Sequence, residues 1–224
     1  MATTMTTSDG YHHGDLREAC IAAGLGLLAD GGPDAVTIRG VARIAGVSHT
    51  APLHHFADRD ALLDAIAQRG FDRLLDRLAS AAEAGSTGPR AQLRAYGLVY
   101  VEEAVRDPGL FTLMFGRARD GIGEEAGHRL VELCAEAIDR GELAAPDAQV
   151  LSLILWSAVH GLASLYVSRY LGQGFVTGEP ADARAGAEAV LDALFAALAP
   201  EAPPPPARRA PTRTRITVSK EIRS

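Results

Sequence analysis

Apolar side chains recur along most of the chain at the three- and four-residue spacing of an amphipathic helix. Ile38, Val41, Ala42 and Ala45 follow this spacing, which places them on one helix face. Comparable patterns predict further helices over residues 15–29, 59–82, 90–106, 110–115, 122–140, 147–171 and 180–198. No segment alternates apolar and polar residues as a half-buried strand does, so the sequence predicts an all-α fold of about nine helices.

Residues 37–56 predict two short helices joined by a tight turn, a helix-turn-helix. Thr37 precedes the first apolar run and is expected to cap it, and Gly46 ends that run where the chain must reverse. Val47 is expected to be buried in the turn, and Ser48 to cap the second helix. In a helix-turn-helix the second helix lies in the major groove of DNA, whereas the alternative interpretation is an ordinary helical hairpin.

Changes in composition divide the chain into five predicted parts. Residues 1–10 are small and polar and are expected to be disordered. A three-helix DNA-binding unit is expected over 11–60, and a linker helix over 61–85 leads to a Gly-Ser-Thr-Gly-Pro break. A helical bundle is expected over 86–199. The Pro- and Arg-rich tail, 200–224, is expected to be extended and disordered.

The net charge of −6 argues at first against a polyanionic partner, because phosphate neutralisation is the largest sequence-independent contribution to DNA affinity. The charge is unevenly distributed, however, since residues 201–224 hold six basic and two acidic side chains. We expect DNA contact to depend on the local placement of Arg39, Arg43 and Arg59 and on helix N-termini. The tail is either a solubilising end or an arm that tethers the protein to DNA.

Cysteine usage and the N-terminal sequence predict a soluble protein of the reducing cytoplasm. Cys20 and Cys134 both lie in apolar helical patterns, which favours buried core side chains over a disulfide or a metal pair. The N-terminus lacks the pattern of a signal peptide, and no apolar run is expected to reach membrane-spanning length. His12 and His13 are adjacent and lack a partner at helical spacing, so neither a metal nor another cofactor is expected.

Aromatic side chains in the second half of the chain suggest a ligand cavity. The cluster over 110–115 is typical either of plain core or of the wall of a small-molecule site. His160 is either a core histidine or a ligand contact, and no Ser, Cys or carboxylate stands near it at a spacing that suggests catalysis, so no enzyme is predicted. The expected cavity residues, which favour an apolar ligand with one polar anchor, are Tyr100, Phe111, Phe115, Trp156 and His160.

The sequence resembles the TetR-like (TetR/AcrR) family of bacterial transcriptional regulators. The resemblance rests on T-I-R-G-V-A-R-I-A-G-V-S, which begins at Thr37, followed by H-F-A-D-R-D-A-L-L, and it covers roughly residues 14–70. Two later segments, D-P-G-L-F-T-L-M-F and W-S-A-V-H-G, are similar to the C-terminal domain of a subgroup named for a Trp-His-Gly (WHG) signature. The family implies an N-terminal unit that reads DNA and a C-terminal domain, here 86–199, that binds an effector and pairs two subunits.

The resemblance implies a homodimer that binds a palindromic operator in double-stranded DNA, most often as a repressor, and responds to a small-molecule effector. Phosphate contacts are implied for Thr37 and Arg59, whereas His55 is as well explained by local packing. The residues expected at DNA are Thr37, Arg39, Ser48, His49, Thr50, His54, His55 and Arg59. Apolar stripes on the last two predicted helices favour a four-helix dimer interface. Its expected members are Val159, Leu162, Tyr166, Val190, Leu191, Leu194, Phe195 and Leu198.

Two positions depart from the family pattern. Leu53 stands where many members have a tyrosine that reaches phosphate and base. Pro52 lies in the first turn of the predicted second helix, where a missing N–H is expected to cost little. His49 and His54 suggest that protonation below about pH 6.5 strengthens DNA contacts. A helical interaction protein that has lost DNA recognition is the remaining alternative.

Overall fold

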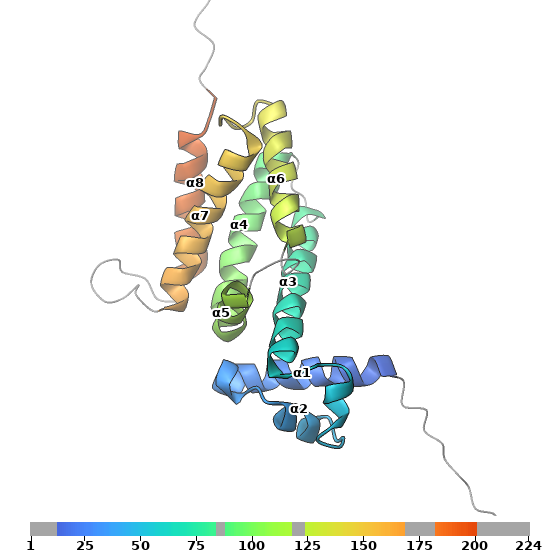
Figure 1. Cartoon of the computed structure of the whole chain (residues 1–224). Helices are drawn as coiled ribbons and strands as arrows, with labels where there is room; N and C mark the ends of the chain where they lie inside the picture. The colour runs from blue at the N-terminus through green and yellow to red at the C-terminus, as the bar shows by residue number, and fades with distance from the viewer. Residues whose placement is uncertain (1–12, 84–87, 118–123, 169–181, 201–224) are drawn as a thin grey trace, which may run out of the picture.

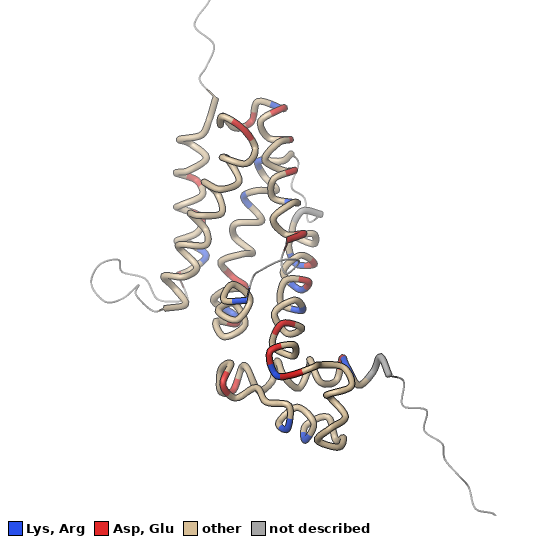
Figure 2. Tube along the Cα trace, viewed as in Figure 1, with Lys and Arg blue, Asp and Glu red and all other residues tan. Residues whose placement is uncertain are grey.

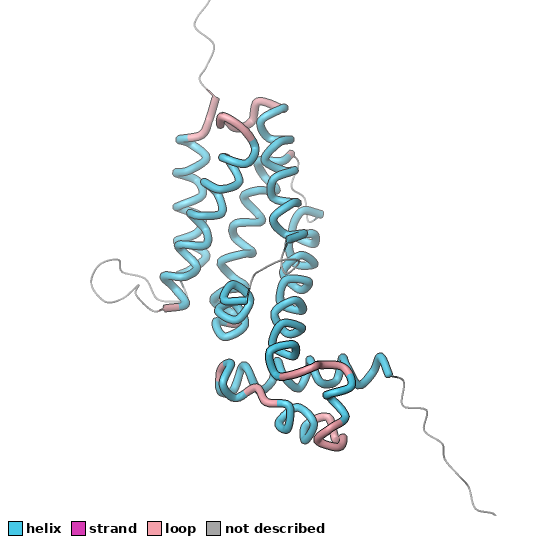
Figure 3. The backbone as a smooth tube through the Cα atoms, viewed as in Figure 1, coloured by secondary structure: helices cyan, strands magenta, loops and turns pink. Residues whose placement is uncertain are grey.

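The computed structural model describes residues 13–83, 88–117, 124–168 and 182–200. Its α-helices are α1 (His13–Gly31), α2 (Ile38–Ile44), α3 (Arg59–Glu83), α4 (Pro89–Arg106), α5 (Pro108–Arg117), α6 (Glu124–Asp139), α7 (Ala148–Val167) and α8 (Ala183–Ala197). Two short 3-10 helices are η1 (Pro33–Ala35) and η2 (Ala51–His54). No strand occurs in the ranges above, and Figure 3 shows helices joined by loops, so the predicted all-α fold is confirmed.

Figure 1 shows a small N-terminal unit, which contains α1 and α2, at one end of an elongated helical body. α3 begins in this unit and continues as one long helix into the body, where it packs against α4 and α5. α4 is central to the body, because it packs against α3, α5, α6, α7 and α8. α5 lies at the end of the body that faces the unit and contacts α1. One apolar core therefore runs through both parts.

A glycine in the middle of α4 allows two other helices to approach closely. A Cβ atom at Gly97 would lie 2.7 Å from Leu191 Cδ1 of α8 and 3.2 Å from Val159 Cγ1 of α7. Both side chains are buried, so a larger residue at this position would have to push them out of a packed core. On the outside of the same contact, the Nε atom of Arg94 donates to Asp192 Oδ1 at 2.8 Å.

The two ends of α2 follow the local signals in the sequence. Thr37 Oγ1 accepts a hydrogen bond from the backbone N–H of Gly40 at 3.0 Å, which confirms the predicted N-cap. Gly46 has φ +69, the left-handed conformation predicted for the residue that ends the helix. The Val47 N–H donates to the Ala42 carbonyl at 3.0 Å, which completes a Schellman motif. Val47 itself is only half-buried, so its predicted burial is wrong.

The second helix of the predicted pair is much shorter than expected, because it is reduced to the 3-10 helix η2. Pro52 lacks the N–H that would donate to the Ser48 carbonyl in an α-helix capped at Ser48, and it instead occupies the first turn of η2. The Ser48 carbonyl accepts from the Ala51 N–H at 3.0 Å. The prediction that Ser48 caps this helix is therefore wrong, because Thr50 precedes η2 and no side chain caps it. The small cost expected for Pro52 stays a prediction. Pro52 is buried, and it anchors the segment.

α5 begins earlier than predicted, at Pro108. The Asp107 carboxylate accepts from the Leu110 N–H at 3.1 Å, and proline is well suited to the first turn because its ring fixes φ near the helical value. The Asp-Pro-Gly sequence thus both ends α4 and starts α5. Both cysteines lie where the sequence predicted, in the core, and burial raises the pKa of the Cys134 thiol to about 12.

α7 is uncharged over its whole length of 20 residues and, by length and composition alone, could cross a membrane. The expectation that no apolar run reaches this length is therefore wrong. A core helix of a soluble protein satisfies the same criterion, and α7 packs against α4, α6 and α8.

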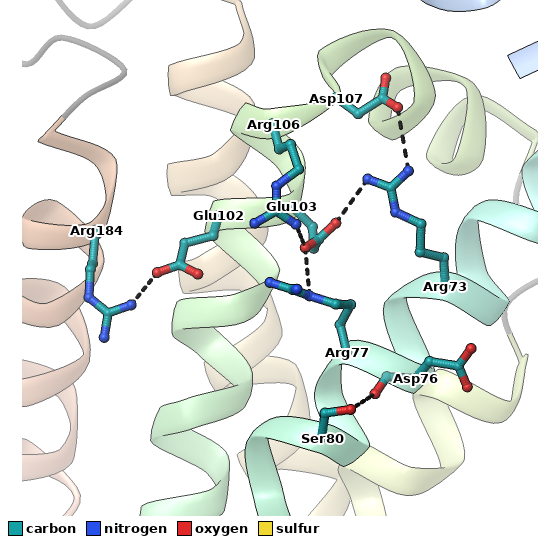
Figure 4. A network of polar contacts seen from close by, with 9 residues as sticks. All are labelled: Arg73, Asp76, Arg77, Ser80, Glu102, Glu103, Arg106, Asp107 and Arg184. Carbon is teal, nitrogen blue, oxygen red and sulfur yellow. Dashed lines mark hydrogen bonds and ion pairs between the residues drawn. The ribbon is translucent and has the colours of Figure 1, made fainter. Parts of the chain in front are cut away.

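A network of ion pairs joins the linker helix α3 to α4, as Figure 4 shows. Glu103 of α4, whose side chain is only 11% exposed, pairs with Arg73 at 3.2 Å, with Arg77 at 3.0 Å and with its neighbour Arg106. Arg73 also lies 3.9 Å from the carboxylate of Asp107. One mostly buried carboxylate thus has three cationic partners, so its loss would leave Arg77 and Arg106 without their carboxylate partner and Arg73 with Asp107 alone.

Candidate functional site

The surface formed by α2, the turn after it and η2 is the candidate DNA interface, which we call the reading face. Residues 35–57 contain two arginines and no acidic residue. Arg39 and Arg43 are both exposed, and neither side chain has an ion-pair or hydrogen-bond partner in the part of the chain that is described. Figure 2 shows the basic positions of α2 at the end of the molecule away from the body. This face can neutralise phosphates although the whole protein is acidic.

Most of the polar residues predicted to meet DNA are exposed on this face, whereas His55 is half-buried and Arg59 belongs to α3. His49, Thr50 and His54 are exposed. Ser48 is exposed too, and its hydroxyl lies 3.4 Å from Thr50 Oγ1. His55 is half-buried, and its ring makes an edge contact with the neighbouring phenyl ring at a centroid distance of 6.4 Å. The local packing interpretation of His55 therefore has direct support.

Two large apolar side chains are also exposed on the reading face. Leu53 of η2 is 48% exposed, and Ile44, the last residue of α2, is 51% exposed. Exposed apolar groups beside polar ones suit base edges, since the thymine methyl group is read by apolar contact. Ile44 was not among the expected DNA contacts. The only feature of the sequence that could have indicated its role is that Ile44 is a bulky apolar residue outside the apolar stripe of α2.

Arg59 begins α3, as predicted, but its guanidinium is already engaged. Its Nε atom donates to the Val36 carbonyl at 2.7 Å and its Nη2 atom donates to the Pro33 carbonyl at 2.5 Å. These two carbonyls belong to the segment that leads into α2, so Arg59 fastens the start of α2 to the start of α3. A phosphate contact by Arg59 would have to compete with both hydrogen bonds.

The body contains a cavity of about 1230 Å³ between α3, α4, α6 and α7. Most of its walls are apolar, as in small-molecule sites generally. The linker helix α3 forms one wall with Phe71, Leu74 and Leu78. Sequence reasoning assigned these three residues only to the apolar stripe of a long helix, and nothing in the pattern indicates that part of this stripe borders a cavity.

Four of the five predicted cavity residues line this space, namely Tyr100, Phe115, Trp156 and His160. The Tyr100 hydroxyl lies 2.7 Å from His160 Nδ1, and the centroid of the Trp156 ring lies 5.3 Å from that of His160. The ring of Phe115 lies 4.7 Å from that of His160. Phe111 is not a lining residue, but it packs behind Phe115 at a centroid distance of 4.9 Å. The cluster over 110–115 is thus mainly core, with Phe115 at the cavity.

Burial shifts the two polar groups at this end of the cavity in opposite directions. It lowers the pKa of His160, because desolvation disfavours the imidazolium ion. It raises the pKa of Tyr100 for the same reason. Both side chains are therefore uncharged near neutral pH. Charged and polar groups of the rim, Glu124, His128 and Gln149, are exposed and were not predicted.

The residues predicted for a dimer interface fall into two groups. Four of them are buried within their own chain: Val159, Tyr166, Leu191 and Phe195. The others are half-buried: Leu162, Val190, Leu194 and Leu198. The apolar stripes of α7 and α8 thus serve in large part to pack against α4. Exposed positions on the same helices carry small or apolar residues instead, among them Gly161, Leu165, Ala185, Ala189 and Ala193.

Several predictions fall outside the residues that are described: the disorder of 1–10, the metal interpretation of His12, and the tail from 201 onward. Within the described ranges, no group of three or more His, Cys, Asp and Glu side chains is arranged to hold a metal ion.

Two family models match the chain. Residues 21–66 match the model for bacterial regulatory proteins of the tetR family, and residues 93–194 match the model for the tetracyclin repressor-like C-terminal domain. The second match does not name the Trp-His-Gly subgroup, so that assignment stays a prediction. No protein of curated function is significantly similar to the chain in sequence.

Solved structures share the fold. A protein with unknown function from Rhodococcus sp. RHA1 is 33% identical over 86% of this chain and 100% of that chain, with a TM-score of 0.73. A transcriptional regulator of the TetR/AcrR family from Thermobifida fusca YX-ER1 is 22% identical over 81% and 97% of the two chains, with a TM-score of 0.61. A TetR-family transcriptional regulator from Pectobacterium atrosepticum is 17% identical over 88% and 99%, with a TM-score of 0.66.

Proposed function

The chain belongs to the TetR family of bacterial transcriptional regulators, whose N-terminal domains bind DNA, and from this premise we propose that it is a repressor released from a palindromic operator by a small apolar effector. It is a transcription factor and not an enzyme. Regulators of this family are soluble, and we place this one in the cytoplasm, where its DNA is. The observation that carries the proposal is the reading face, which holds two arginines and no acidic residue, and neither arginine has an ion-pair partner among the described residues.

α3 supplies the connection between effector and DNA. Its middle turns line the cavity with Phe71, Leu74 and Leu78, so a ligand that fills the cavity touches this helix directly. The start of α3 is fixed to α5, because Arg117 of α5 pairs with Asp64 at 2.6 Å and with Asp60 at 3.2 Å. A ligand that binds one position of α3 more tightly than another changes where the reading face lies.

Dimerisation gives this displacement its effect. Two reading faces must lie about 34–36 Å apart to enter successive major grooves, so a small change at each α3 spoils simultaneous binding. We propose that α7 and α8 pair across a twofold axis through their exposed faces, where Gly161, Ala189 and Ala193 allow close helix packing and Leu165 supplies apolar area. The proposed interface thus consists of exposed residues of α7 and α8 and not of the apolar stripe predicted from the sequence, half of which is buried in the subunit.

The dimer is tested with a matched pair of variants. Ala189→Arg introduces a large cation into the proposed interface and should convert the dimer to monomer, as measured by sedimentation velocity. Ala79→Arg places the same side chain at an exposed alanine of α3 and should leave the dimer intact. A dimer that survives Ala189→Arg contradicts this interface.

Footprinting of the DNA upstream of the gene tests operator binding. We expect two protected segments related by dyad symmetry, with centres about 10 base pairs or a multiple of that distance apart. An absence of protection at every protein concentration would instead favour a helical interaction protein. Deletion of the gene should raise transcription from this DNA, and a fall in transcription would make the protein an activator.

A further inference from the structure

One hydrogen bond in the wall of the cavity, between Tyr100 and His160, has a defined direction. The Tyr100 hydroxyl and His160 Nδ1 lie 2.7 Å apart, and a phenol is the better proton donor of the two while an imidazole nitrogen is the better acceptor. The Tyr100 proton is therefore directed to Nδ1.

This direction fixes the tautomer of His160. With Nδ1 as acceptor, a neutral imidazole carries its proton on Nε2. No residue of the described chain accepts a hydrogen bond from Nε2, although His160 is only half-buried and lines the cavity. His160 thus presents its Nε2–H beside aromatic rings that can offer no acceptor of comparable strength.

The charge of the lining limits the ligand further. No arginine or lysine is among the described residues that line the cavity, and the one carboxylate there, Glu124, is exposed at the rim. Ser152, another polar lining residue, already donates its hydroxyl proton to the Gln149 carbonyl at 2.8 Å. An anion that lost its hydration against these described lining residues would gain no arginine or lysine partner from them, which is costly.

We propose that the cavity takes an uncharged, mainly apolar ligand whose carbonyl oxygen accepts a hydrogen bond from His160 Nε2–H. This inference rests on the proposed role of the cavity as the effector site, and it adds the chemical class of the effector. Acyl anions and other carboxylates are excluded from this class, and so are amines, which have no acceptor for the Nε2–H when protonated.

The chain offers a direct readout, because Trp156 is its single tryptophan and lines the cavity. Tryptophan emission of the full-length protein is titrated with three probes of equal carbon number: methyl heptyl ketone, nonanoate and nonylamine. We expect the ketone to bind at least about tenfold more tightly than either charged probe, since burying an unpaired charge costs several times the free energy of one hydrogen bond.

Variants at His160 separate the hydrogen bond from general packing. His160→Leu should weaken ketone binding about fivefold, as expected for one neutral hydrogen bond, whereas His160→Gln keeps an N–H donor and should retain most of the affinity. Gln92→Leu also replaces a polar side chain by leucine, at a position of α4 that does not line the cavity, and should have no effect. Thermal unfolding of each variant checks that it is folded.

Each other outcome overturns the proposal. Tighter binding of nonanoate or nonylamine, a ketone affinity that is unchanged in His160→Leu, or no change of emission with any probe all contradict it. Failure here is distinct from failure of the proposed function: a protein that protects its operator but binds none of the probes remains a regulator with a different effector. A protein that binds the ketone but no DNA keeps the ligand class and loses the regulatory role.

Discussion

Arg59 and Arg43 are both basic residues of the DNA-binding unit, and the structure gives them different roles. Arg59 donates hydrogen bonds to the carbonyls of Val36 and Pro33, whereas Arg43 is exposed without a partner among the described residues. Replacing each by methionine keeps most of the aliphatic stem and removes the guanidinium. We predict that Arg59→Met lowers the stability of the protein and that Arg43→Met lowers the salt dependence of DNA binding.

The magnitude for Arg59→Met follows from its two hydrogen bonds. A buried hydrogen bond to a charged group contributes about 1.5–3 kcal/mol. The Arg59 side chain is 39% exposed, so water replaces part of what is lost, and the ion pair with Asp34 at 3.8 Å adds little because that carboxylate is fully exposed. We therefore expect a loss of roughly 1–2 kcal/mol for the pair of bonds. That corresponds to a fall in Tm of about 2–8 °C for a chain of this size.

Arg43→Met should leave the free energy of unfolding unchanged within about 0.5 kcal/mol, since the exposed side chain has no hydrogen bond or ion pair to lose among the described residues. In a dimer the substitution removes two phosphate contacts, and each contact contributes about 0.9 to the slope of log affinity against log salt concentration. The slope should become shallower by about 1.8. Urea unfolding gives the stabilities, and fluorescence anisotropy with a labelled operator duplex at several NaCl concentrations gives the slopes.

The reverse pattern would refute this reasoning. If Arg59→Met makes the salt slope shallower and leaves the free energy of unfolding unchanged, then Arg59 contacts phosphate and the two carbonyls do not hold it. If Arg43→Met leaves the slope unchanged, then the reading face is not where the phosphates lie.

Three further predictions concern stability. Gly46→Ala should cost about 1 kcal/mol in urea unfolding, because φ is +69; a Cβ there meets no neighbour, so the cost comes from the backbone alone. Gly127→Ala in the exposed part of α6 should instead stabilise the protein by up to about 1 kcal/mol. Equal effects of the two substitutions would contradict this argument. Burial lowers the folded-state pKa of His160 below 6.5, so the unfolded state binds more protons and stability falls as the pH drops through about 6.5. His160→Gln should therefore weaken the fall in Tm between about pH 7.5 and 5.5. An unchanged fall would mean that His160 does not contribute to the pH dependence of stability. Glu103→Gln removes the carboxylate that pairs with three arginines, of which Arg73 keeps Asp107 as a partner, and it should lower Tm by several degrees at low salt and by less at high salt. A loss that does not depend on salt would indicate packing instead.

Sequence reasoning succeeded where the physical cause is local. The cap at Thr37 depends on a backbone N–H three residues away, and the left-handed turn at Gly46 depends on that residue alone. Pro52 shows the limit of such reasoning. It was expected in the first turn of a helix capped at Ser48, but the structure has a 3-10 helix that begins at Ala51, with Thr50 at the N-cap position.

The remaining features depend on contacts between distant parts of the chain. Arg59 bonds to a carbonyl 23 residues earlier, and Tyr100 meets His160 across 60 residues. The periodicity of α8 correctly marked an apolar face, but a stripe that packs on its own core has the same spacing as a stripe that packs on a partner. Leu191 was therefore predicted at a dimer interface, although it lies in the core against Gly97.

The central claim is that the acidic chain binds DNA through its reading face. The most direct test is a fluorescence-anisotropy titration of the labelled upstream duplex with the full-length protein, repeated at NaCl concentrations between about 50 and 200 mM. Arg39 and Arg43 of two subunits predict a log–log salt slope of about −3.6 or steeper. A slope near zero, or no binding at the lowest salt concentration, would contradict the claim.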